Sequence, residues 1–136
     1  MTETNTQALN GTRILVVEDE YFLADDLARA LRDVGAEPVG PVSSLEEAEA
    51  RLGEAAVDGA VLDMNLHGDM AFELAERVAA AGLPCVIVSG YSEQALPPAL
   101  AGLARLEKPV DPGAVVARLA EQFGDAAPAG DTAKPA

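Results

Sequence analysis

The stretch RILVVEDE, residues 13–20, decides the fold class, because an apolar run stops abruptly at three consecutive acidic residues. A nearly continuous run of Ile, Leu and Val is typical of a strand that is buried on both faces of a parallel sheet. Two further runs share this character, residues 59–63 (GAVLD) and 84–89 (PCVIVS), and each also ends on a polar residue. The sequence therefore predicts a parallel sheet with polar groups gathered at one edge.

Two weaker runs, residues 37–42 (EPVGPV) and 103–107 (LARLE), predict the edge strands of the same sheet. Proline fits an edge because it cannot donate to a central hydrogen-bond ladder. Helical spacing of apolar residues predicts helices over 22–34, 44–54, 70–81 and 111–123. A fourth helix, expected within residues 92–102, should be irregular because two adjacent prolines interrupt it.

The regular alternation of strands and helices predicts one α/β domain with a doubly wound, five-stranded parallel sheet in a (βα)5 arrangement. We expect the folded domain to cover residues 12–124. The segments 1–11 and 125–136 are small, polar or rich in Gly and Pro, so both predict flexible ends.

The charge of the chain restricts its partners, because 9 basic residues stand against 23 acidic ones, for a net charge of −14. Such a chain repels nucleic-acid phosphates and anionic lipids. No apolar run reaches the roughly 18 residues of a membrane span, and the N-terminus lacks the apolar core of a signal peptide. We expect a cytoplasmic protein that binds neither nucleic acid nor membrane. A single cysteine, Cys85, excludes an intrachain disulfide.

Polar side chains follow the predicted strands where their carboxyl ends should converge. These residues are Glu18, Asp19 and Glu20, then Asp63, then Ser89, and finally Lys108. Clustered carboxylates repel one another unless a hard cation such as Mg²⁺ joins them. Lys108 could then hold an oxyanion such as a phosphoryl group, and Ser89 could donate to it. Asp63 becomes a candidate nucleophile that forms an acyl phosphate.

Each of these residues also has a purely structural interpretation. Acidic residues after a strand often cap the next helix. Asp63 and Ser89 could be turn residues, and Lys108 could lie in a solvated loop. Their joint occurrence at predicted strand ends favours a site.

Four motifs in order, RILVVEDE, AVLDMNL, VIVSGY and LEKP, resemble the receiver domain of two-component response regulators over about residues 12–124. The resemblance implies a flavodoxin-like or CheY-like fold with strand order 2-1-3-4-5. It implies a Mg²⁺ site and a phosphorylated aspartate. The implied metal ligands are Glu18, Asp19, Asp63 and the backbone carbonyl of Asn65. The other implied residues are Asp63 as phosphoacceptor, Ser89 at the Thr/Ser position, Lys108 as the family's lysine, and Pro109 after a cis peptide bond.

Two positions depart from the common receiver pattern. Arg105 stands three residues before the lysine, where most receivers have an aromatic switch residue. Tyr91 instead follows Ser89 by two positions, which resembles the receiver subgroup named for its PFxFATGY motif, although Cys85 and Val88 depart from it. We expect Tyr91 to respond to phosphorylation.

The resemblance implies a single-domain response regulator that a sensor histidine kinase or histidine phosphotransfer protein would phosphorylate. It would catalyse its own phosphorylation and dephosphorylation, and it would not be a conventional enzyme. The chain ends soon after the fifth helix, so we expect no output domain. Signalling would proceed by onward phosphotransfer or by binding a protein through the fourth helix, fifth strand and fifth helix.

Two other functions stay open at this point. The first is a receiver-fold module that docks without phosphorylation, which the departure at Arg105 keeps in play. The second is a phosphatase with an aspartyl-phosphate intermediate. Such enzymes typically have a second acid two residues after the nucleophile, where this chain has Asn65, so rapid phosphate turnover is disfavoured.

Overall fold

The structure is a computed structural model that describes residues 6–54, 56–90 and 97–130. Five parallel strands form one sheet in the order β2-β1-β3-β6-β7. They are β1 (Arg13–Val17), β2 (Glu37–Val42), β3 (Gly59–Asp63), β6 (Cys85–Ser89) and β7 (Ala104–Glu107). This order is the predicted 2-1-3-4-5, because β4 (Asn65–Leu66) and β5 (Asp69–Met70) form a separate small hairpin.

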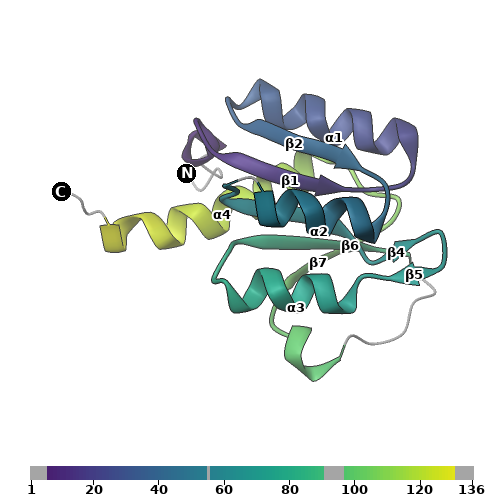
Figure 1. The fold of residues 1–136 in the computed structure, drawn as a ribbon. Helices are drawn as coiled ribbons and strands as arrows, with labels where there is room; N and C mark the ends of the chain where they lie inside the picture. Colours follow the sequence, from purple (N-terminus) through teal and green to yellow (C-terminus); the bar gives the residue numbers. More distant parts are fainter. Residues whose placement is uncertain (1–5, 55, 91–96, 131–136) are drawn as a thin grey trace.

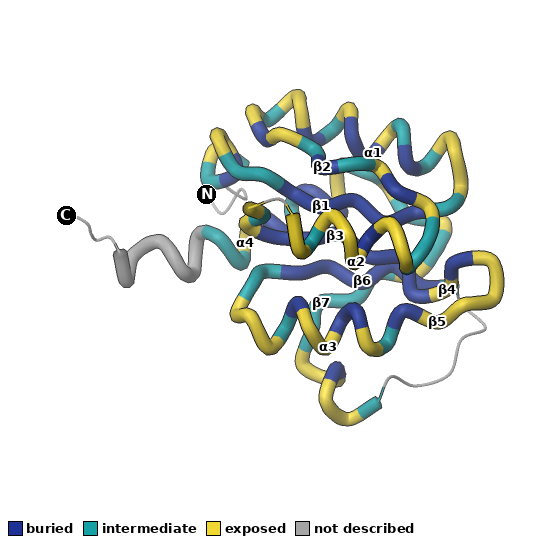
Figure 2. Tube along the Cα trace, in the orientation of Figure 1, coloured by how far each residue is buried: buried dark blue, intermediate teal, exposed yellow. Residues whose placement is uncertain are grey.

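Helices cover both faces of the sheet (Figure 1). On one face lie α1 (Tyr21–Asp33) and α4 (Pro112–Gly130), and on the other lie α2 (Leu45–Glu54) and α3 (Phe72–Ala80). In β1, Ile14 and Val16 pack toward the first face, whereas Leu15 and Val17 pack toward the second. Apart from Arg13 at the start of β1, the residues of the central strands β1, β3 and β6 are therefore buried (Figure 2), which explains their continuous apolar sequence.

Side-chain caps fix the starts of two helices. Ser44 Oγ accepts a hydrogen bond from the Glu47 N–H at 3.1 Å, and Glu47 Oε1 accepts one from the Ser43 N–H at 3.3 Å. These bonds cap the start of α2. Asp111 Oδ2 accepts from the Ala114 N–H at 3.1 Å and thereby caps α4.

One large apolar residue at the start of α1, Phe22, is exposed. Phe22 is 80% exposed and packs edge-on against Tyr21, with ring centroids 5.4 Å apart. The buried side of α1 instead consists of Ala24, Leu27, Ala28 and Leu31. At about 100° per residue, Phe22 falls nearly opposite Ala24, so it cannot share this stripe.

Part of segment 1–11, which we expected to be flexible, packs on the domain in the structure. Thr6–Leu9 forms the 3-10 helix η1, and Leu9 is fully buried among residues of α1 and α4. Thr12 Oγ1 donates to the Leu9 carbonyl at 2.6 Å, and the Gly11 N–H donates to the Gly35 carbonyl at 2.9 Å. Leu9 is the one large apolar residue of 6–11, and a single such residue shows no periodicity, so the sequence pattern did not indicate this packing.

The C-terminal helix is also longer than predicted. We expected the domain to end at 124 and a flexible tail to follow, but α4 continues to Gly130. Alanine-rich sequence favours continuation of a helix. Residues 131–136 lie outside the described part of the chain.

The connection between β6 and β7 contains no regular α-helix within the residues described. After Pro97 the chain forms the short 3-10 helix η2 (Pro98–Leu100), with the Leu100 N–H donating to the Pro97 carbonyl at 2.8 Å. The turn predicted before Pro97 falls within residues 91–96, outside the described residues. No helix in the described ranges has the length and apolarity needed to cross a bilayer.

Candidate functional site

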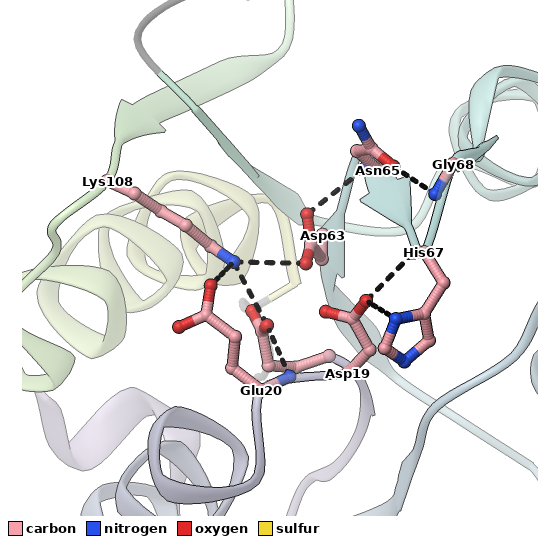
Figure 3. A network of polar contacts seen from close by, with 8 residues as sticks. Asp19, Glu20, Asp63, Asn65, His67, Gly68 and Lys108 are labelled. Carbon is pink, nitrogen blue, oxygen red and sulfur yellow. Dashed lines mark hydrogen bonds and ion pairs between the residues drawn. The ribbon is translucent and has the colours of Figure 1, made fainter.

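The sheet brings four predicted site residues to one pocket at the carboxyl ends of its strands. Glu18 and Asp19 follow β1, Asp63 is the last residue of β3, and Lys108 follows β7 (Figure 3). One carboxylate oxygen each from Glu18, Asp19 and Asp63 lies within 4.8 Å of the other two. Because β1 and β3 are neighbours in the sheet, the strand order itself produces this cluster.

Lys108 binds three carboxylates. Its Nζ lies 2.7 Å from Glu20 Oε2, 3.0 Å from Glu18 Oε2 and 3.1 Å from Asp63 Oδ2. Its backbone N–H donates to the Ser89 carbonyl at 2.7 Å, which fixes the start of the side chain at the pocket. Burial alone would lower the pKa of Lys108, but the hydrogen bonds that it donates to the carboxylates outweigh burial and raise the pKa.

Asp63 lies at the bottom of the pocket and is 2% exposed. Its Oδ1 accepts a hydrogen bond from the Asn65 N–H at 3.0 Å, while its Oδ2 faces Lys108. Burial raises the pKa of the Asp63 carboxyl, and the bonds from Asn65 and Lys108 oppose that increase. Hydrogen bonds to both carboxylate oxygens thus fix the orientation of the Asp63 side chain.

Glu18 is a buried acid with one unpartnered oxygen. Burial raises its pKa to about 7, against the opposing hydrogen bond from the Glu20 N–H, and the nearby Asp63 charge adds to the increase. Oε2 accepts from Glu20 and Lys108, whereas Oε1 is buried and has no hydrogen-bond partner among the described residues. An unsatisfied buried carboxylate oxygen in a cluster of hard oxygen donors fits a divalent cation such as Mg²⁺.

The β4–β5 hairpin forms the outer wall of the pocket, a feature that we did not predict. Asp19 Oδ2 accepts from the His67 N–H at 2.8 Å and lies 3.3 Å from His67 Nδ1. Gly68 N–H donates to Asn65 Oδ1 at 2.7 Å. The His67 side chain is exposed, but its backbone N–H and its Nδ1 both lie against Asp19. The sequence feature that could have indicated this hairpin is the dipeptide His67–Gly68, which suits a tight two-residue turn. Both residues have positive φ in the structure.

Ser89 lies beside this pocket with an unexpected partner. It is fully buried at the end of β6, and its Oγ accepts a hydrogen bond from Arg105 Nε at 3.0 Å. The Lys108–Pro109 peptide bond is cis, as the resemblance implies. Tyr91 lies outside the described residues, so its predicted role as a switch stays a prediction.

Comparison with known families now decides the class of protein. The family model described as response regulator receiver domain matches residues 14–120. This chain belongs to that family. Receiver domains are parts of two-component systems and are generally not conventional enzymes. They bind Mg²⁺ at an acidic pocket, and this receiver has an acidic cluster in that place. No curated protein matches the sequence.

Solved structures similar to this receiver domain include SdrG from Sphingomonas melonis Fr1, at 34% identity and a TM-score of 0.69, covering 82% of this chain and 97% of that one. A CheY-like receiver domain protein from Methanospirillum hungatei JF-1 is 24% identical with a TM-score of 0.76, covering 88% and 98%. The response regulator PhyR from Brucella abortus is 20% identical with a TM-score of 0.74, covering 94% of this chain but 56% of that one. The last two show likeness of fold.

Proposed function

We propose that Asp63 accepts a phosphoryl group from the phosphohistidine of a sensor histidine kinase or histidine phosphotransfer protein, in a reaction that requires Mg²⁺. The observation that carries this proposal is the placement of Asp63. It lies at the bottom of the pocket, with Lys108 Nζ 3.1 Å from one oxygen and two further carboxylates beside it. A nucleophile, a fixed ammonium and a set of hard oxygen ligands are the parts that phosphoryl transfer needs.

The metal ligands in this proposal are Glu18, Asp19, Asp63 and the backbone carbonyl of Asn65. When bound, Mg²⁺ would neutralise negative charge on the phosphoryl oxygens and on the carboxylates. The unpartnered Glu18 Oε1 supports this assignment, because a buried carboxylate oxygen that accepts no hydrogen bond from the described residues is free to bind a hard cation.

The transfer uses an oxygen of Asp63 as nucleophile. This oxygen forms a bond to phosphorus while the bond from phosphorus to the donor imidazole nitrogen breaks, and the imidazole leaves with the electron pair. Lys108 and the Ser89 hydroxyl then bind oxygens of the transferred group. Lys108 already faces Asp63 and needs no large displacement. The chain itself thereby catalyses its phosphorylation and later the loss of the group by hydrolysis.

We further propose that the domain over residues 12–124 acts in the cytoplasm through protein partners. The net charge of −14 supports partners with basic or apolar surfaces rather than nucleic acid or membrane. A downstream protein would bind the surface made by the segment after β6, by β7 and by α4. Onward phosphotransfer is the other route by which the signal would leave Asp63.

The decisive test is Mg²⁺-dependent phosphorylation by acetyl phosphate, with intact mass as the readout. The variants are Asp63→Asn and, as a matched control, Asp69→Asn, which removes an exposed carboxylate from β5. We expect one phosphoryl group on wild type and on the control, none on Asp63→Asn, and none in EDTA. Equal modification of Asp63→Asn would refute the assignment. If wild type also stayed unmodified by a phosphohistidine donor, docking without phosphorylation would be the better function.

A further inference from the structure

Arg105 and Ser89 form a side-chain pair across β7 and β6. In the parallel register, Arg105 lies opposite Ile87, and Ser89 lies opposite Glu107, so Arg105 and Ser89 are diagonal neighbours on one face of the sheet. Arg105 Nε donates to Ser89 Oγ at 3.0 Å. The surroundings on this face are apolar, since Ile87 belongs to the core cluster there.

The chemistry of the two groups gives this hydrogen bond a direction. A guanidinium has only donors and stays charged at any physiological pH, so Ser89 Oγ must be the acceptor. The hydroxyl keeps its single proton for another acceptor. A bond from a charged donor also polarises the hydroxyl, which makes it a stronger donor.

The acceptor that this proton would meet is set by the neighbouring strands. Asp63 lies opposite Val88 in the β3–β6 register, one residue before Ser89. Asp63 and Ser89 thus both lie at the carboxyl ends of neighbouring strands, so a phosphoryl group on Asp63 would come close to the Ser89 hydroxyl. Its oxygens are acceptors for the proton that the hydroxyl keeps.

We infer that Arg105 is a positioning residue for phosphorylation, which holds and polarises the Ser89 hydroxyl so that it donates to the phosphoryl group on Asp63. This inference rests on the proposed function. It assigns a role to the residue that stands in place of the aromatic side chain found in most receivers. Arg105 acts through Ser89, so its effect must vanish when the Ser89 hydroxyl is removed.

The test is a double-mutant cycle on the rate of phosphorylation by acetyl phosphate with Mg²⁺, followed by intact mass. The variants are Arg105→Met, Ser89→Ala and the double variant. Arg77→Met is the matched control, because Arg77 is a half-exposed arginine on α3 that pairs with Glu49 at 3.7 Å, away from the pocket. We expect Arg105→Met to slow phosphorylation about tenfold, as is usual for outer partners of a site. The double variant should be no slower than Ser89→Ala, and Arg77→Met should match wild type.

A merely structural role predicts a different result. If Arg105→Met slows the Ser89→Ala variant by the same factor as wild type, or leaves the wild-type rate unchanged, the inference is overturned. Circular dichroism checks that each variant is folded. If Arg105→Met does not fold, Arg105→Lys replaces it in the same double-mutant cycle. Lysine keeps the positive charge but lacks the Nε–H group that donates to Ser89. If wild type itself takes up no phosphoryl group, the proposed function fails first, so the two failures are distinguishable.

Discussion

Replacing Glu18 by glutamine should stabilise the metal-free domain at alkaline pH, although it removes a functional carboxylate. Glu18 is 2% exposed, and burial raises its pKa from 4.5 to about 7. The folded state thus resists ionisation of this group. Glutamine has nearly the same shape and can still accept from the Glu20 N–H and from Lys108, so the substitution mainly removes the buried charge.

The size of the effect follows from the pKa difference. Above pH 7 the Glu18 carboxyl is ionised in both the folded and the unfolded protein. The difference between its two pKa values then destabilises the folded protein by about 3 kcal/mol, at about 1.4 kcal/mol per pKa unit. Between pH 4.5 and about 7 the folded state binds more protons than the unfolded state, so stability falls as pH rises through this window. At pH 5 the cost is below about 1 kcal/mol. The advantage of Glu18→Gln should therefore grow from pH 5 to pH 8.

Urea unfolding followed by circular dichroism in EDTA measures this difference. Glu73→Gln is the control, because Glu73 is an exposed acid in the first turn of α3 and its neutralisation changes the net charge equally. We expect the control to show no comparable gain. An advantage of Glu18→Gln that is absent at pH 8, or that is the same at pH 5 and pH 8, would refute the reasoning.

Three further predictions concern the same domain. Mg²⁺ should raise the thermal midpoint of unfolding. Its affinity, measured by calorimetry, should increase about tenfold from pH 6 to pH 8, because Glu18 must lose its proton to bind a cation. An affinity that does not change with pH would count against Glu18 as a ligand. Leu9→Ala should destabilise the domain by about 2–4 kcal/mol in urea unfolding, because Leu9 is fully buried; a loss near zero would restore a flexible N-terminus. Glu20→Gln should speed phosphorylation by acetyl phosphate, because it removes the carboxylate closest to Lys108; an unchanged or slower rate would show that Glu20 does not compete for the lysine.

The sheet was predictable because each strand carries its own signal. The apolar runs gave all five strands, with β6 and β7 each starting one residue later than expected. The pocket was predictable for the same reason, since residues that end neighbouring parallel strands must converge. The order of the strands was therefore enough to predict which side chains lie together at the pocket, namely Glu18, Asp19, Asp63 and Lys108.

The contacts that escaped prediction depend on geometry between elements. Leu9 is buried because it packs against α1 and α4, and no periodicity within the N-terminal segment encodes that contact. His67 reaches Asp19 because a tight hairpin turns it back over the pocket. Arg105 reaches Ser89 through the β6–β7 register, which no pattern within either strand specifies.

The buried carboxylates that destabilise the metal-free domain also explain why its stability should depend on cation binding. Burial raises the pKa values of both Glu18 and Asp63, so the folded domain holds carboxylates whose ionisation it disfavours. A cation that binds the folded state alone removes that cost and stabilises the fold by mass action. By reciprocity, protonation of Glu18 weakens cation binding by the same factor by which a bound cation disfavours that protonation. Substitutions that relax the cluster, such as Glu18→Gln, should therefore gain stability and lose affinity for Mg²⁺, and a variant that gained both would contradict this coupling.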